Sequence, residues 1–168
     1  GITIGVGMPT KLNNEIRISM VIFQPGYTRQ VYSKQLLHED ELPYFVAGNE
    51  QILISIADTK IAPAISYESL QSSHVDNFSK LGAHIYLASV AKSELGITTA
   101  MDYYSEISIK YNMPVLVSNS IGPCDNFISA GKSSVWNDKG ILLAQLDSCM
   151  ERVLIFNTET NLVKQVFL

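Results

Sequence analysis

Residues 61–87 read IAPAISYESLQSSHVDNFSKLGAHIYL, and this stretch decides the fold of the chain. An apolar run of strand length, Lys60–Ile65, precedes residues with helical spacing between Tyr67 and Gly82. A second apolar run, His84–Ala88, follows, and Gly82 stands where a glycine commonly ends a helix. The pattern therefore predicts a strand, a helix and a strand in succession, which is typical of layered α/β folds.

The alternation continues towards the C-terminus. Apolar residues with helical spacing, from Met101 to Tyr111, end before Pro114, where another run of strand length begins. Turn residues separate further apolar runs on both sides of this core. The remaining expected strands are Ile2–Val6, Ile16–Phe23, Gln51–Ala57, Pro114–Val117, Ser133–Trp136, Ile141–Ala144 and Arg152–Phe156. Hairpins beside a βαβαβ core predict a mixed sheet rather than a purely parallel one.

Length and charge limit what the chain can be. No repeat or linker divides the 168 residues, so we expect residues 1–168 to form a single domain. A formal net charge of −4 and the lack of any run of Lys and Arg argue against a nucleic-acid surface. The longest apolar stretches have only strand length, so we expect no membrane partner.

The N-terminus and the cysteines point to one compartment. The first residues lack the basic start and cleavage pattern of a signal peptide. Cys124 and Cys149 fit no CxxC spacing; free thiols are the expected state, with a disulfide between them left open. We therefore expect a cytoplasmic protein.

Three segments carry residues suited to chemistry. They are Tyr32–Leu37 with a lysine, Glu41–Gly48 with a carboxylate, and Ser66-Tyr67-Glu68 at the end of an apolar strand. A strand-to-helix junction exposes a nucleophile where backbone N–H groups can hold an oxyanion. A lysine can add positive charge there, and a carboxylate can orient it. A serine alone in this place is more often a helix N-cap, so the order of the three segments decides the interpretation.

In this order the segments resemble the carbon–nitrogen hydrolase superfamily, which includes nitrilases, amidases and carbamoylases. The family motif Tyr-x-Lys-x-x-Leu matches Tyr32–Leu37 and puts Lys34 in the place of the catalytic lysine. The motif Glu-x-x-x-Phe-x-x-Gly matches Glu41–Gly48. Ser66-Tyr67-Glu68 stands where the family has Cys-Tyr-Glu or Cys-Trp-Glu, so a serine replaces the nucleophilic cysteine.

The resemblance extends downstream. Segments 81–87, 115–122 and 130–140 resemble the Gly-Ala-Asp strand, the Val-x-x-x-Asn-x-x-Gly strand and the Gly-x-Ser…Gly hairpin of the family. This implies an α/β fold: the mixed-sheet α-β-β-α sandwich of the nitrilase type, missing its first N-terminal elements. The family's general-base glutamate belongs to those elements, and Glu15, which we expect between strands, does not replace it.

The resemblance also implies a reaction. The family hydrolyses non-peptide carbon–nitrogen bonds of small amides or nitriles through an acyl-enzyme, without metal or cofactor. Lys34 and the backbone N–H of Tyr67 would stabilise the oxyanion, Glu41 would orient Lys34, and Ser66 would take the nucleophile's position. Asn119 is expected to shape the pocket. A homodimer or larger homo-oligomer is implied as well, and the sequence has neither HExxH nor CxxC metal spacing.

The main interpretation is a chain with the fold of an amide hydrolase that is itself inactive because Ser66 replaces the cysteine. Two alternatives to this interpretation stay open. One is a non-catalytic relative that keeps the fold for ligand binding or assembly, since both the thiol and the base are absent. The other is an unrelated serine amidase, for which Gly131-Lys132-Ser133-Ser134 gives a faint motif. The Gly-x-Ser-x-Gly elbow of α/β-hydrolases is not found around Ser66.

Overall fold

The computed structural model describes residues 1–167, and its largest element is a six-stranded sheet. The strand order is β11-β10-β7-β6-β5-β4. These strands are β4 Ile54–Ile56, β5 Thr59–Ile65, β6 Ile85–Val90, β7 Val115–Asn119, β10 Ser134–Trp136 and β11 Leu142–Gln145. The central pairs β5–β6 and β6–β7 are parallel, whereas β4, β10 and β11 are added antiparallel. The prediction of an α/β fold with a mixed sheet is therefore confirmed.

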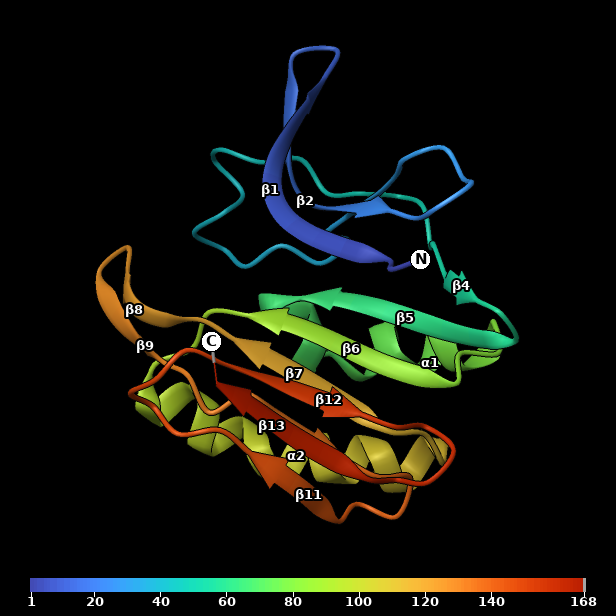
Figure 1. Ribbon diagram of the computed structural model, residues 1–168. Coiled ribbons are helices and arrows are strands. Elements are labelled where there is room, and N and C mark those ends of the chain that lie inside the picture. Colours follow the sequence, from blue (N-terminus) through green and yellow to red (C-terminus); the bar gives the residue numbers. More distant parts are fainter. Residues whose placement is uncertain (168) are drawn as a thin grey trace.

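Two α-helices supply the crossovers between the parallel strands and lie together along the large sheet (Figure 1). The helix expected between Tyr67 and Gly82 is divided: a 3₁₀ turn, η1 Ser66–Leu70, precedes α1 Ser72–Lys80. The break falls at Gln71, which has extended backbone angles. Gly82 follows α1 with a φ of 81°, as a glycine that ends a helix commonly does.

The second crossover helix, α2 Glu94–Tyr111, begins a full two turns before the first residue that its apolar spacing had marked. Ser93 caps it, since the Ser93 side chain accepts a hydrogen bond from the Gly96 backbone N–H. Asn112 ends the helix in the left-handed conformation, with a φ of 50°. The cap and the left-handed residue explain both boundaries.

A separate three-stranded sheet lies beyond β5 (Figure 1). Its strands are β1 Ile4–Leu12, β2 Glu15–Phe23 and β3 Gln30–Ser33. Asn13 and Asn14, both with positive φ, form the tight β1–β2 turn. Glu15 thus starts β2 opposite Leu12 instead of lying between strands, which corrects that expectation.

The two sheets share one hydrophobic core, but only one of them is covered on both faces. Met20, Ile22 and Tyr32 of the small sheet belong to the same buried cluster as Ala64 and Ala88 of the large one. The other face of the small sheet is open, and no helix among residues 1–167 covers it. Its strands carry large apolar side chains that are exposed: Ile4, Val6, Met8, Leu12, Ile16, Phe23 and Val31.

Four short strands complete the chain as two hairpins, β8 Ile121–Cys124 with β9 Phe127–Ala130, and β12 Arg152–Phe156 with β13 Val163–Phe167. Of these, only β12 was expected from the sequence. The others have only four or five residues each, which is too short for a clear apolar pattern.

Candidate active site

Ser66 occupies a strained turn at the carboxyl end of β5. It has a φ of 53°, a left-handed conformation that costs about 1–3 kcal/mol for a residue other than glycine. The N-cap of the 3₁₀ turn is Ile65, and no side chain caps it, so Ser66 is not an ordinary helix cap. Such strain persists where the surroundings impose it, and it is common at functional sites.

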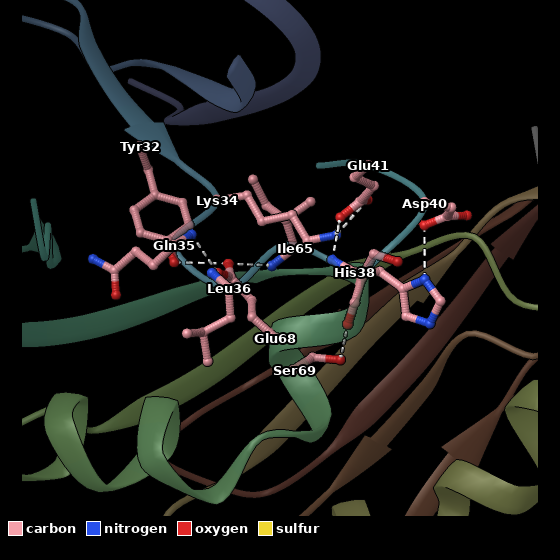
Figure 2. A network of polar contacts seen from close by, with 11 residues as sticks. Tyr32, Lys34, Gln35, Leu36, His38, Asp40, Glu41, Ile65, Glu68 and Ser69 are labelled. Atoms are coloured by element: carbon pink, nitrogen blue, oxygen red, sulfur yellow. Dashed lines mark hydrogen bonds and ion pairs between the residues drawn. The ribbon is translucent and has the colours of Figure 1, made fainter. Parts of the chain in front are cut away.

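Lys34 follows β3 and is almost completely buried, with 1 % of its surface exposed. Its Nζ donates to both carboxylate oxygens of Glu41, at 2.6 and 2.7 Å (Figure 2). The Glu41 carboxylate also accepts a hydrogen bond of 2.7 Å from the His38 backbone N–H. The structure thus brings the predicted lysine and glutamate together as a buried, bidentate ion pair.

The loop that carries Glu41 is closed by a glycine that no other residue could replace without a shift. The Gly48 backbone N–H donates to the Lys34 carbonyl at 2.8 Å. A Cβ atom added at Gly48 would lie 2.3 Å from the Ser33 carbonyl oxygen. The glycine of the Glu-x-x-x-Phe-x-x-Gly motif is therefore required by close backbone packing next to Lys34.

Glu68 connects the lysine segment to the serine turn. Its buried carboxylate accepts hydrogen bonds from the Gln35, Leu36 and Ile65 backbone N–H groups at 2.7, 3.2 and 2.8 Å (Figure 2). The Tyr32 hydroxyl donates a fourth bond of 2.7 Å. Burial raises the pKa of Glu68, and the donors oppose that rise by stabilising the carboxylate.

A buried histidine on α1 extends the same hydrogen-bond network. His74 on α1 lies between two tyrosines, with its Nε2 2.8 Å from the Tyr32 hydroxyl and its Nδ1 2.8 Å from the Tyr86 hydroxyl. Burial lowers the pKa of His74 to about 4, so its ring is neutral at pH 7. Sequence reasoning assigned no role to Glu68 or His74, although Glu68 belongs to a motif that it used.

Tyr67 and Asn119 differ in what they contact. Tyr67 follows Ser66 in the first turn of η1, where backbone N–H groups have no partner within the helix. Its ring packs edge-on against His38, with centroids 5.2 Å apart. The buried Asn119 side chain instead contacts the backbone of Lys92 and Gly131. A direct contact of either residue with substrate stays a prediction.

A small apolar cavity lies between the two sheets beside the serine turn. Its volume is about 270 Å³, and Ile65 and Ser89 form the wall contributed by the large sheet. Met20 and Phe45 lie on the opposite side. A primary amide with a short carbon chain is small enough for this space.

The other candidate groups are placed away from this site. Lys132 pairs with Glu94 on the surface, and the Ser134 hydroxyl donates to the Lys132 carbonyl, so they form no catalytic triad of a serine amidase. Cys124 and Cys149 are free thiols. Within residues 1–167 no three His, Cys, Asp or Glu side chains gather as a metal site. No helix of the described chain is both long and apolar enough to cross a membrane.

Solved structures show where this fold occurs. The sequence itself matches no family model and no curated protein. The structure is similar to a glutamine-dependent NAD⁺ synthetase from Acinetobacter baumannii, with a TM-score of 0.86 and 22% identity over 97% of this chain and 33% of that one. It is also similar to XC1258 from Xanthomonas campestris, described as a CN-hydrolase superfamily protein, with a TM-score of 0.78 and 14% identity over 98% and 61% of the two chains.

A third similar structure is the NitN amidase from Nesterenkonia sp. AN1, with a TM-score of 0.79 and 18% identity over 88% of this chain and 60% of that one. The chain thus spans between one third and about three fifths of the length of these proteins. At such identities the similarity concerns the fold. The chain has the fold of the carbon–nitrogen hydrolase, or nitrilase, superfamily.

Proposed function

We propose that this chain, which has the carbon–nitrogen hydrolase fold, binds small amides or nitriles in the cavity beside Ser66. We also propose that residues 1–168 form part of one hydrolase domain. The observation that carries the proposal is the strained Ser66 turn, joined through Glu68 to the segment of a buried Lys34. The energy needed to hold a non-glycine residue at a positive φ is explained if its side chain must face a ligand.

The residues divide the chemistry as follows. The Ser66 hydroxyl would attack the amide carbon, and the Lys34 ammonium with the Tyr67 backbone N–H would stabilise the oxyanion that forms. Glu41 holds Lys34 in place, and both of its oxygens are engaged by the ammonium. Glu41 is therefore not free to take the serine proton.

Turnover by this chain is expected to be slow or absent. A thiol has a pKa near 8.5 and is readily ionised beside a cation, whereas a serine depends on an adjacent base. The resemblance to the family assigns no residue among 1–167 to the position of the general-base glutamate. Binding without hydrolysis, in a non-catalytic relative, is therefore the second candidate function, and Ser66 is the observation that favours it.

An acylation experiment tests the site directly. The Ser66→Cys variant is mixed with p-nitrophenyl butyrate, and intact mass and peptide mapping show where a butyryl group is attached. We expect stoichiometric acylation at position 66, because the Lys34 ammonium favours a thiolate. The unaltered chain, which keeps Cys124 and Cys149, measures background acylation of other thiols.

Two further variants give the comparison its control. Both variants are made in the Ser66→Cys background, and the rate of acylation at position 66 is measured. Lys34→Met should abolish rapid acylation, whereas Lys132→Met, which alters a lysine paired with Glu94, should leave the rate unchanged. Equal rates in the two lysine variants would show that the lysine segment does not serve position 66, and the proposed hydrolase site would be wrong.

Assembly and location complete the proposal. The exposed apolar face of the small sheet supports a homodimer or larger homo-oligomer, since surfaces of this kind are usually covered. The free thiols support a cytoplasmic location. Sedimentation analysis over a range of concentrations checks the first point: a chain that stays monomeric throughout would contradict it.

A further inference from the structure

Two buried hydroxyl groups connect the serine turn to helix α2. The Ser69 hydroxyl donates to the Ser66 carbonyl oxygen at 2.6 Å (Figure 2). The hydroxyl oxygens of Ser69 and Tyr104 are 2.9 Å apart. Ser69 and Tyr104 are both 0% exposed, so water does not compete for these hydrogen bonds. A chain of hydrogen bonds therefore joins α2, which carries Tyr104, to the turn that carries Ser66.

The number of available protons fixes the direction of this chain. A serine hydroxyl has a single proton, and the proton of Ser69 goes to the Ser66 carbonyl. Ser69 Oγ must therefore accept from the Tyr104 hydroxyl, which is the donor of the 2.9 Å bond. Burial raises the pKa of Tyr104 to about 12, so the phenol keeps the proton that it donates. Bonds arranged in this way polarise one another, and each strengthens the next.

Packing fixes the first donor of the chain. The Tyr104 ring lies at a tilt against Trp136 of β10, with the ring centroids 5.6 Å apart. Both rings belong to the buried core that the two sheets share. Side chains in a close-packed core cannot shift without opening a cavity or forcing a neighbour to move. The position of the Tyr104 hydroxyl is thus set by the core and does not depend on the loop segments around the site.

The hydrogen bond to the Ser66 carbonyl also sets the direction of the next backbone N–H. The peptide group between Ser66 and Tyr67 is planar and trans, as are all peptide groups of the described chain. In a trans peptide the N–H points opposite to the C=O. Because the Ser66 carbonyl points to Ser69, the Tyr67 N–H points away from Ser69. This N–H belongs to the first turn of η1 and has no acceptor within the helix.

We propose that Ser69 and Tyr104 are positioning residues, which hold the Ser66–Tyr67 peptide group so that the Tyr67 N–H faces the oxyanion formed at position 66. This rests on the proposed function, because that function assigns the oxyanion to the Tyr67 N–H and Lys34. Ser69 and Tyr104 do not touch the substrate, and both act through the Ser66 carbonyl. A purely local role, in which the two hydroxyls only stabilise the turn, is the alternative that an experiment must separate.

Two reactions of one thiol make that separation. In the Ser66→Cys variant, the thiolate attacks the carbonyl carbon of p-nitrophenyl butyrate, an oxyanion forms, and p-nitrophenolate leaves as the ester C–O bond breaks. With iodoacetamide the thiolate instead displaces iodide from carbon, and no oxyanion forms. Both reactions need the thiolate, so the ratio of their rates at position 66 reports the stabilisation of the oxyanion. Peptide mapping by mass spectrometry over time measures both rates.

We expect Ser69→Ala, made in the Ser66→Cys background, to lower the ratio of acylation to alkylation by about tenfold or more, because the oxyanion donor is no longer held in place. Tyr104→Phe removes one oxygen and keeps the ring against Trp136. It should lower the ratio by about threefold, since Ser69 keeps its own donor but loses the bond that orients it.

Ser108→Ala in the same background is the matched control. The buried Ser108 hydroxyl donates to the Ser105 carbonyl at 2.7 Å, which is the same three-residue spacing, but on α2. This variant should leave the ratio unchanged. If Ser69→Ala does not fold, Tyr104→Phe decides the question alone.

The possible failures of the two proposals differ. A ratio that Ser69→Ala and Tyr104→Phe leave unchanged, including an equal fall of both rates, overturns the positioning role and leaves the amide site standing. Acylation at position 66 that is no faster than the background at Cys124 and Cys149 overturns the proposed function, and the positioning role with it.

Discussion

The two sheets of this molecule are built from similar residues but are used differently. The large sheet is surrounded, and its central strands β5, β6 and β7 are mostly buried. The small sheet contributes one face to the same core and leaves the other open. The candidate site lies where the two meet, with Lys34 from one and Ser66 from the other. We therefore expect the large sheet to supply most of the stability and the small sheet to supply the second half of the candidate site.

The largest expected effect comes from truncating one phenylalanine at each sheet and comparing the two losses in unfolding free energy. Phe78, on α1, is fully buried against the large sheet, whereas Phe23, on β2, is 47% exposed. Phe78→Ala should reduce the free energy of unfolding by about 3–5 kcal/mol, because it leaves a cavity. Phe23→Ala should cost less than about 1 kcal/mol in urea denaturation. A comparable loss in both variants would mean that the open face is covered in solution.

Replacing one carboxylate oxygen of Glu68 should weaken the hydrogen bonds that join the lysine segment to the serine turn. Glu68→Gln replaces a carboxylate that accepts four hydrogen bonds with an amide whose NH₂ faces donors. We expect a loss of about 2–3 kcal/mol in unfolding free energy. Hydrogen exchange should accelerate at the Gln35, Leu36 and Ile65 amides first. Glu50→Gln, which alters an exposed carboxylate, is the matched control and should change neither quantity.

Acidification should weaken the same junction through His74. The folded-state pKa of His74 is about 4 and the unfolded value is about 6.5, so the unfolded chain binds the extra proton between these values. The stability from neutral His74 is thus present above about pH 6.5 and is lost as the pH falls towards 4. The expected loss by pH 4 is on the order of 3 kcal/mol.

The groups that face His74 set the control for that measurement. They are Tyr32, Tyr86 and Glu68, whose pKa values are all raised mainly by burial. Glu68 takes up a proton more readily when folded, because its pKa is raised, and this opposes the His74 effect at pH values above the usual pKa range of a glutamate. Because Glu68 is present in both chains, the pH profiles of the unaltered chain and of His74→Gln, each determined by denaturation, should differ in slope between about pH 6.5 and 4. Parallel profiles would contradict a buried neutral His74.

The smallest expected effect has the opposite sign. Ser66→Gly should stabilise the chain by about 1 kcal/mol, because glycine adopts a φ of 53° without the steric cost borne by serine. Ser55→Gly, in strand β4, should instead destabilise it by about 0.5–1 kcal/mol. If both substitutions destabilise, the turn at Ser66 is not strained in solution.

Much of the fold could be predicted because it depends on the spacing of apolar residues that are close in sequence. The strand–helix–strand succession and the mixed sheet follow from spacing that neighbouring residues determine. The pairing of Lys34 with Glu41 was expected from the order of the motifs, and the two residues are in contact. Their catalytic roles stay predictions.

The rest depends on contacts between distant segments. In the sequence, Glu68 is one polar residue in an expected helical turn. Its role follows only from the hydrogen bonds that its carboxylate accepts from the Gln35 and Leu36 backbone N–H groups. Ser69 carries no motif, and its hydrogen bond with Tyr104 joins residues that are 35 positions apart in sequence. The division of the first helix at Gln71 likewise left no break in the apolar spacing.

The carboxylate of Glu68 has a consequence for the order in which the protein matures. It takes hydrogen bonds from residues that leave the ribosome more than thirty positions earlier, at Gln35. A nascent chain that ends before Glu68 has the lysine but lacks the acceptor that holds its segment against the serine turn. The segment of Lys34 and the turn at Ser66 can therefore be joined only after β5 and η1 have been synthesised and have docked, so this part of the candidate site forms late in synthesis.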